Sequence, residues 1–405
     1  MLELTIIHRA FLELIKISIG TSNADFDFSL LTDDDWNRVI DESKKQATVL
    51  LCFDALKNVE YKPNSELYNR WFLMSAANLK NNIRVINEQE FLINLLNDNK
   101  IPYVILKGSS SACYYPDSKI RSLGDVDFIV DSSYLDKTKE LILGAGYELD
   151  DNTSPVHLEF SRNKVRIELH KTISGIPNNK YGAAFSKEIP NFTENSVLEY
   201  GYFRPCDFHH AIVIFLHTLH HLLNNGIGIR HLCDWACFVN RTKQDAFWEE
   251  RFIPLLKKTG TFKFMCGLTA TAAQLLGIEM PTWCVSVPEN MVDTLIYEIV
   301  SSGNFGRKKS KQYSLIMTRM DSGKSSVFSK IRGMLNALNK TNHLVYPIIK
   351  KIQIIYPFVM IYRIVRYLIL MFMGKKPSLI ETSRYADERS AVFRNYQLYN
   401  IEDDK

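Results

Sequence analysis

Three acidic residues on short apolar runs are the part of this sequence best suited to chemistry. Asp125 and Asp127 begin the run DVDFIV, and Glu168 lies inside VRIELH. Because alternate residues of a β-strand point to the same face, we expect Asp125 and Asp127 to project side by side. Two adjacent carboxylates repel each other unless a cation lies between them. The pattern therefore predicts a metal site with Asp125, Asp127 and Glu168 as its ligands.

A glycine turn precedes these acids. The apolar run from Tyr103 to Leu106 leads into Lys107-Gly108-Ser109, where a glycine lets the backbone turn sharply and approach a ligand closely. Backbone N–H groups after Gly108, at the start of a helix, are expected to bind phosphates, and Ser109 adds a hydroxyl donor. A phosphate-binding turn together with three carboxylates on strands is what metal-assisted phosphoryl or nucleotidyl transfer requires.

These residues resemble the DNA-polymerase-β-like nucleotidyltransferase superfamily, whose pattern is Gly-Ser, then Asp-x-Asp, then a third acid on a neighbouring strand. The chain is similar, more narrowly, to a bacterial group of uncharacterised nucleotidyltransferases. The matching segments are Leu106-Lys107-Gly108-Ser109, Tyr115-Pro116, Arg121, Gly124-Asp125-Val126-Asp127 and Glu168-Leu169-His170. The resemblance is close over roughly residues 100 to 172. Over the rest of the chain it is loose and rests only on the expected helices. One departure is a longer interval between Gly108 and Asp125 than in the most compact members.

The resemblance implies a reaction with two Mg²⁺ ions. Asp125 and Asp127 would hold the ions against the triphosphate of an NTP, and Glu168 would be the third ligand or the base. A nucleoside monophosphate would pass to a hydroxyl and pyrophosphate would be released. The acceptor is open at this point: a sugar, a small metabolite, a protein side chain or a nucleic-acid end.

Three residues beside the acids are candidates for contacts to the nucleotide. Lys107 and Arg121 are candidates for phosphate contacts, since their cationic groups pair with phosphate oxygens. Lys107 is also typical of a surface lysine at a strand end, and Arg121 of a structural partner for Asp117 or Asp125. His170 shares a strand face with the third carboxylate, which favours a role in positioning it or in contacting substrate.

Six of the ten histidines lie between His209 and His231. His217 and His221 are four residues apart on a predicted helix, a spacing that can bind zinc. We favour histidines that line a core or a pocket, because no metalloprotease glutamate and few thiols lie nearby. Arg230 and Asp234 follow; in the resembling family a similar element closes over the nucleotide base, and the alternative for Asp234 is an acid on a helix surface.

The predicted fold is α+β, with a small mixed-sheet nucleotidyltransferase core embedded between helical domains. We expect an N-terminal helical region over 1–98, the α/β core over 99–205, a helical domain over 206–302, and a basic stretch with C-terminal helices over 303–405. The 405 residues, 46% of them apolar, exclude wholesale disorder and favour two or three domains. The expected helices after the sheet span 207–224, 229–240, 245–258, 262–276 and 288–302.

Charge and cysteines indicate the compartment. The net charge of +4 is too small to imply nucleic-acid binding, but Arg307 to Lys351 holds eleven Lys or Arg residues and only one acid. The apolar run from Tyr356 to Gly374 carries two arginines, which favours a packed or interfacial helix over a membrane span. Seven cysteines without a C-x-x-C pair fit a reducing cytoplasm. We therefore expect a cytoplasmic protein, with possible peripheral contact to the inner membrane surface through 307–376.

Two other functions compete with an enzyme. The fold could serve as a non-catalytic nucleotide-binding or partner-binding module, although the intact acidic trio argues against this. Alternatively, the basic stretch and the apolar run after it would suit a membrane-surface component of a glycan or peptide biosynthetic pathway.

Overall fold

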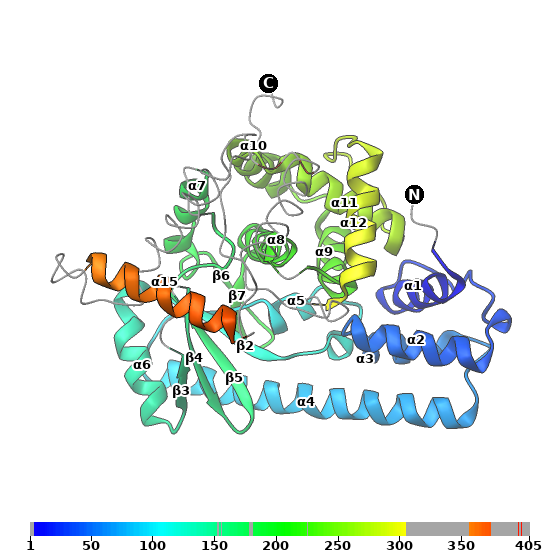
Figure 1. The fold of residues 1–405 in the computed structure, drawn as a ribbon, viewed down its shortest axis with the longest axis horizontal. Coiled ribbons are helices and arrows are strands. Elements are labelled where there is room, and N and C mark those ends of the chain that lie inside the picture. The colour runs from blue at the N-terminus through cyan, green and yellow to red at the C-terminus, as the bar shows by residue number, and fades with distance from the viewer. Residues whose placement is uncertain are drawn as a thin grey trace.

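A computed structural model describes residues 4–151, 154, 156–177, 181–224, 226–304, 356–373, 396 and 398. It confirms the α+β class, with a five-stranded mixed sheet and many helices. In Figure 1 the sheet lies between the long helix α4, below it, and a group of later helices, above it. The basic stretch Arg307 to Lys351 lies outside the described residues.

The sheet has the strand order β1-β2-β5-β4-β3. The bounds are β1 Tyr103–Leu106, β2 Asp125–Val130, β3 Glu148–Asp151, β4 His157–Arg162 and β5 Val165–His170. β2 pairs parallel with β5 and antiparallel with β1, and β4 pairs antiparallel with both β5 and β3. β4 and β5 form a hairpin, and Asn163 and Lys164 form its turn. Both have positive φ, which matches the right-handed twist of a tight hairpin.

A second, two-stranded sheet was not expected from the sequence. It consists of β6 (Ser196–Glu199) and β7 (Tyr202–Pro205). β6 alternates poorly between apolar and polar residues and exposes Val197 and Leu198, so its sequence gives little strand signal. β7 lies against β1 and extends the apolar packing at that edge of the main sheet, where Phe203 contacts Tyr103 edge-on.

Four helices precede the sheet: α1 Ile6–Ile19, α2 Asp33–Lys45, α3 Val49–Ala55 and α4 Ser65–Asp98. As predicted, the acids Asp33 to Asp35 open α2, and Thr32 caps it through a capping box with Asp35. α4 is 34 residues long; its earlier part lies along α2 and α3, and its later part lies along the sheet (Figure 1).

The helices within and after the sheet include three very short ones. The bounds are α5 Gly108–Ala112, α6 Leu135–Gly144, α7 Gly182–Ser186, α8 Asp207–Asn224, α9 Ile229–Thr242, α10 Ile253–Thr259, α11 Phe262–Leu276, α12 Glu289–Ser302 and α15 Tyr356–Phe372. Single 3₁₀ turns span Phe28–Leu30, Leu56–Asn58, Ser118–Ile120, Ser132–Tyr134 and Ile189–Asn191, and a π turn spans Trp248–Phe252. α8 and α11 have the predicted bounds. The helix expected over 245–258 is instead the π turn followed by α10.

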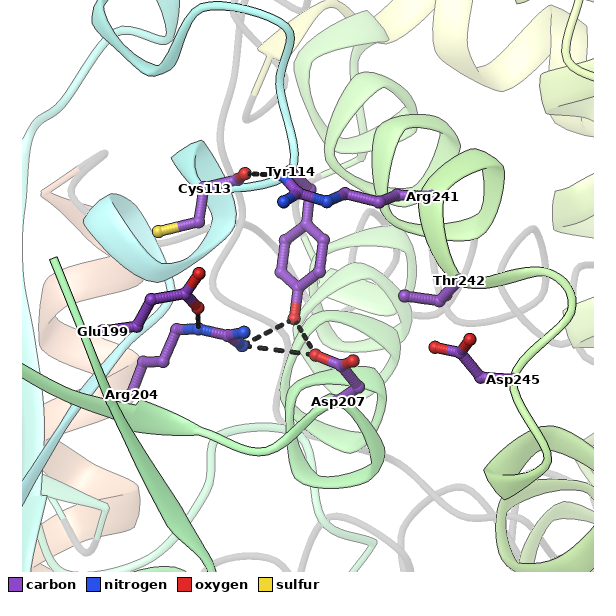
Figure 2. Close-up of a pocket in the computed structure, with 8 residues that line it drawn as sticks. All are labelled: Cys113, Tyr114, Glu199, Arg204, Asp207, Arg241, Thr242 and Asp245. Atoms are coloured by element: carbon purple, nitrogen blue, oxygen red, sulfur yellow. Dashed lines mark hydrogen bonds and ion pairs between the residues drawn. The ribbon is translucent and has the colours of Figure 1, made fainter.

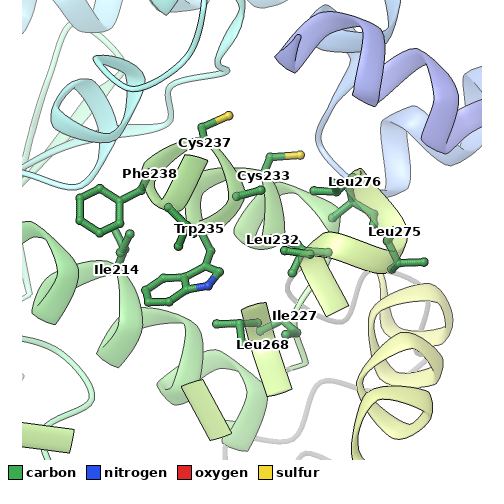
Figure 3. Packing of buried hydrophobic residues seen from close by; sticks show 14 of the residues in the cluster. Ile214, Ile227, Leu232, Cys233, Trp235, Cys237, Phe238, Leu268, Leu275 and Leu276 are labelled. Atoms are coloured by element: carbon green, nitrogen blue, oxygen red, sulfur yellow. The ribbon is translucent and has the colours of Figure 1, made fainter. Parts of the chain in front are cut away.

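The helices before and after the sheet share one hydrophobic core. Trp71 of α4 and Trp235 of α9 are fully buried in the same cluster, which also takes in α1, α3, α8, α11 and α12. Figure 3 shows Trp235 and Phe238 of α9 beside Ile214 of α8 and Leu268 of α11. A second cluster fills the space around the sheet. The domain boundaries at 98/99, 205/206 and 302/303 stay predictions.

Among the residues that the structure describes, no helix is long and apolar enough to cross a membrane. α15 nevertheless exposes an apolar row at helical spacing, with Phe358 71% exposed and Ile361, Val365 and Ile369 about half exposed. Such a row is typical of a helix that lies on another surface. Contact with a membrane through 307–376 stays a prediction.

Candidate active site

The sheet brings the three predicted carboxylates onto one face. In the parallel pairing of β2 with β5, Asp127 lies directly opposite Glu168, and Asp125 lies two residues earlier on the same strand. Residues two apart on a strand share a face, so all three side chains project together. Asp127 is almost fully buried and Asp125 partly so. Glu159 of β4 lies directly opposite Glu168, but β4 is one strand further from β2, and Glu159 pairs with Arg166 at 2.9 Å. Glu168 is therefore the acid beside Asp127.

Lys107 and His170 neutralise the most deeply buried of these acids. Lys107 Nζ lies 2.5 Å from Asp127 Oδ1, and His170 Nε2 lies 2.8 Å from the same oxygen. Burial alone would raise the pKa of Asp127, but the ammonium of Lys107 and the hydrogen bond from His170 outweigh it and hold this pKa below its usual range. Although burial and Lys107 oppose protonation of His170, its hydrogen bonds to Asp127 and Glu168 raise its pKa.

Asp125 is different, because Lys107 and Arg230 act on its charge only from a distance. Within the described part of the chain its carboxylate has neither an ion pair nor a hydrogen bond. Burial, together with the negative charge of Asp127, raises the pKa of Asp125 to about 6. A partly buried carboxylate with no partner, beside two others, is the electrostatic condition in which a divalent cation binds strongly.

Glu168 lies between two imidazoles. His157 Nδ1 and His170 Nε2 each lie 3.3 Å from Glu168 Oε2. Ligand atoms of His157, Glu168 and His170 all lie within 4.8 Å of one another, close enough to share one metal ion. Burial lowers the pKa of His157 despite the neighbouring carboxylate, so this ring is neutral and is able to donate or accept at Glu168.

The phosphate turn differs from the sequence prediction. The residue with positive φ is Lys107 (φ 43°, ψ −124°), while Gly108 begins α5. A Cβ on Gly108 would meet the Asp125 carbonyl oxygen at an ordinary 3.6 Å, so close packing does not explain this glycine. The Ser109 hydroxyl donates to Gln89 Oε1 of α4 at 2.6 Å. The expectation that glycine supplies the sharp turn is therefore wrong: a lysine carries it, at a cost of about 1–3 kcal/mol typical of functional sites.

Arg121 pairs with a residue that was not among its expected partners. Its Nε and Nη2 donate to the two carboxylate oxygens of Asp234 at 2.7 and 2.8 Å, and Tyr115 donates its hydroxyl to the same carboxylate at 2.7 Å. Neither Asp117 nor Asp125 is the partner. Asp234 is largely buried, so the alternative of an acid on a helix surface is wrong as well.

Arg230 of α9 was not among the residues expected to contact phosphate. It is partly buried, and its Nη2 donates to the Ser122 carbonyl oxygen at 2.8 Å. Burial, with Arg121 nearby, lowers its pKa, and Asp125 is one of the acids whose field it feels. No ion pair of Arg230 occurs in the described part of the chain. The Arg-x-x-x-Asp pattern was the sequence signal that pointed to Arg230. Asp234 lies one helical turn after Arg230 on α9 and pairs with Arg121.

Two hollows lie near these elements. Lys107 and His170 line a narrow one with His217 of α8. A larger cavity of about 210 Å³ is lined mainly by residues of β6, β7, α8 and α9 and by the two residues that follow α5, with none of the three carboxylates among them. Figure 2 shows that its charged groups are partly paired: Arg204 bonds Glu199, Tyr114 and Asp207. The carboxylate trio, and not this larger cavity, is therefore the candidate active site.

A family model described as an uncharacterised nucleotidyltransferase matches residues 32–277. This is more than half of the 405 residues and includes all three carboxylates together with α8 and α9. The chain belongs to this nucleotidyltransferase family. The match confirms the resemblance drawn from the Gly-Ser, Asp-x-Asp and Glu-Leu-His segments. No curated protein and no solved structure matches the chain.

Proposed function

We propose that this nucleotidyltransferase moves a nucleoside monophosphate from an NTP to a hydroxyl group of an acceptor, releasing pyrophosphate, with Mg²⁺ as its cofactor. The observation that carries the proposal is the grouping of Asp125, Asp127 and Glu168 on one face of β2 and β5, with Asp127 opposite Glu168. The unpaired carboxylate of Asp125, whose pKa is raised to about 6, supports the binding of a cation at this place.

The three carboxylates fit a pair of Mg²⁺ ions. Mg²⁺ takes a few carboxylate oxygens and completes its octahedron with phosphate oxygens and water, so Asp125, Asp127 and Glu168 are sufficient protein ligands. When bound, Mg²⁺ neutralises the charge of the triphosphate and promotes ionisation of the attacking hydroxyl. Lys107 has to release Asp127 when the metal site fills, because its ammonium lies 2.5 Å from one of that residue's oxygens.

Each neighbouring side chain then has a role that follows from its contacts. His170 orients Asp127 through their 2.8 Å bond, and its other nitrogen, Nδ1, contacts the Thr172 carbonyl oxygen at 3.1 Å, which fixes the ring. Lys107, once free of Asp127, is placed to neutralise the released pyrophosphate. Arg230 is the guanidinium available for phosphate oxygens, since Arg121 is held by Asp234.

Glu168 is placed either to bind a metal or to accept the proton of the acceptor hydroxyl. Its 3.3 Å contact to the neutral ring of His157 provides a path by which a proton leaves the carboxylate, whereas both nitrogens of His170 already act as donors. The backbone N–H groups that follow Lys107 contribute to phosphate binding in this proposal, and Ser109 contributes only if its hydroxyl leaves Gln89.

Product formation tests the proposal directly. The protein is incubated with each labelled NTP, Mg²⁺ and a cell extract, and both pyrophosphate release and labelled products are measured. We expect Mg²⁺-dependent release that Asp127→Ala abolishes, while Glu148→Gln, a change at an exposed acid of edge strand β3, preserves it. Nucleotide binding without pyrophosphate release, with every extract and NTP, would instead support the non-catalytic binding module.

A further inference from the structure

Three histidines outside the carboxylate trio come together where α8 packs on α9. His217 and His221 lie one turn apart on α8, and His231 lies in the first turns of α9. The ring centroids are 4.4 Å apart for His217–His221, 5.6 Å for His217–His231 and 5.2 Å for His221–His231. One ring nitrogen from each lies within 4.8 Å of those of the other two. The pair at i, i+4 that was visible in the sequence therefore acquires its third imidazole through helix packing.

We propose that His217, His221 and His231 form a binding site for a transition-metal ion of the zinc class. Imidazole nitrogen suits Zn²⁺, Co²⁺ and Ni²⁺, and three histidines with an open fourth position form a recurring zinc site. With Zn–N bonds of about 2.0–2.1 Å, tetrahedral ligand nitrogens lie roughly 3.4 Å apart. The three nitrogens already lie within 4.8 Å of one another, so small side-chain rotations close the site.

The surroundings keep these imidazoles in the form that binds metal. Burial is the main reason that the pKa of each ring is lowered, to about 2 for His221 and about 4 for His231. The pKa of His217 also lies well below its usual value for the same reason. A neutral ring has one nitrogen lone pair to offer. The proposal itself rests on the geometry of the three rings, which these shifts support.

His217 Nδ1 is buried and, among the described residues, has no hydrogen-bond partner, so it is available to a ligand. Both ring nitrogens of His209 and His210 are without a hydrogen-bond partner in the same way. The proposal therefore rests on the convergence of ring nitrogens from His217, His221 and His231.

Two other buried histidines of α8 show what an ordinary core histidine looks like here. His209 stacks on Phe192 with ring centroids 4.4 Å apart, and His210 packs against Tyr114 at 4.8 Å. Within the described part of the chain, neither belongs to a group of ligand atoms that could hold an ion. Burial alone therefore does not bring histidine ring nitrogens together as they are at His217, His221 and His231.

The proposed ion would lie beside the active site. His217 lines the narrow hollow that Lys107 and His170 also line. The ion would join α8 to α9 close to Arg230, which reaches back to the Ser122 carbonyl oxygen. The site stands independently of the proposed transfer reaction, because its ligands and the carboxylate ligands are different residues.

Cobalt titration of the full chain tests the site. With Mg²⁺ in excess to occupy the carboxylates, Co²⁺ is expected to bind with the visible ligand-field bands of a low-coordinate nitrogen site, and Zn²⁺ should displace it. His217→Ala should weaken binding by about 10²-fold or more, since even partners of ligands contribute 10–100-fold. His209→Ala is the matched control from the same helix and should bind like the wild type. No ligand-field signal in the wild type would overturn the proposal.

The second candidate group, His157 with Glu168 and His170, needs its own control. If His157→Ala abolishes the signal and His217→Ala preserves it, the metal binds at the sheet and the proposal is wrong. If His217→Ala fails to fold, X-ray absorption of the zinc-loaded wild type decides. Three imidazole ligands per zinc support the α8–α9 site, whereas a shell of mainly oxygen ligands refutes it.

Discussion

Removing the charge of Asp125 should stabilise the metal-free protein while abolishing transfer. The pKa of this carboxyl is raised from 3.8 to about 6 by burial and by Asp127. Each pKa unit corresponds to 1.36 kcal/mol, so ionised Asp125 costs the fold about 3 kcal/mol. Since unfolding entropy is about 2.1 cal/mol/K per residue, 1 kcal/mol corresponds to roughly 1 °C in a chain of this length. Asp125→Asn should therefore raise the Tm by roughly 3–4 °C at pH 7.5 in EDTA.

The pH dependence gives this prediction its sign. Because the pKa of Asp125 is higher in the folded state than in the unfolded state, the penalty is absent below pH 4, grows between pH 4 and 6, and is complete above. The advantage of Asp125→Asn should therefore shrink to about 1 kcal/mol at pH 4.5. Mg²⁺ should reverse the order at pH 7.5, because it stabilises the wild type through a ligand that the variant lacks.

Thermal unfolding followed by circular dichroism, at both pH values and with or without Mg²⁺, measures all three effects. Glu148→Gln is the control for loss of a carboxylate, since this residue is exposed on edge strand β3. The reasoning fails if Asp125→Asn melts at or below the wild-type temperature at pH 7.5 in EDTA, or if its advantage is the same at pH 4.5.

Four further predictions concern other parts of the site and the surface. Glu168→Gln should lower kcat by about 10²-fold or more while nucleotide affinity falls less, and Glu159→Gln should keep a kcat near that of the wild type. Equal losses of kcat in both variants would contradict the assignment of Glu168 as the third carboxylate. Arg121→Gln should destabilise the fold by about 3–5 kcal/mol because it leaves buried Asp234 without its ion pair. Arg230→Gln loses only a hydrogen bond to the Ser122 carbonyl oxygen, so it should destabilise the fold less and should bind NTP more weakly in equilibrium titrations. NTP with Mg²⁺ should raise the Tm, and EDTA should erase the shift; an equal shift without divalent metal would indicate phosphate binding by basic residues alone. If α15 and the basic stretch contact a membrane, the protein should float together with vesicles that contain anionic lipids. A protein that stays out of the floating fraction would contradict membrane contact.

The grouping of the two aspartates could be predicted from the sequence because its signal is local. Alternation along β2 places Asp125 and Asp127 on one face, whatever the tertiary structure around them. The choice of Glu168 over Glu159 needed the strand order of the sheet, which no local pattern contains. Glu159 lies opposite Glu168 across the hairpin, but it is β5 that pairs with β2, and this pairing sets Glu168 opposite Asp127.

The partners of charged side chains could not be predicted, because they come from distant parts of the chain. Arg121 pairs with Asp234, which follows it by 113 residues, and nearby Asp117 or Asp125 looked equally suitable. Likewise, no sequence pattern predicts that Lys107, and not the neighbouring Gly108, adopts a positive φ. Local backbone preference favours glycine for a positive φ, yet the residue that adopts it is the lysine that pairs with Asp127.

The long interval between Gly108 and Asp125, the one departure from compact family members, is held by polar contacts on two sides. From α4, Asn82 donates to the Arg121 carbonyl oxygen at 2.9 Å and accepts the Leu123 N–H at 2.7 Å. From α9, Asp234 binds the Arg121 side chain, and Arg230 binds the Ser122 carbonyl oxygen.

Asp125 follows this loop directly, so its position depends on helices that lie before and after the sheet in sequence. Those helices share one hydrophobic core, and a loop tied to both cannot shift without disturbing that core. This explains how an extended loop can hold the Asp125 carboxylate, the proposed metal ligand, as firmly as a short one. Residues 32–277, which the family model matches, include both helices that hold the loop.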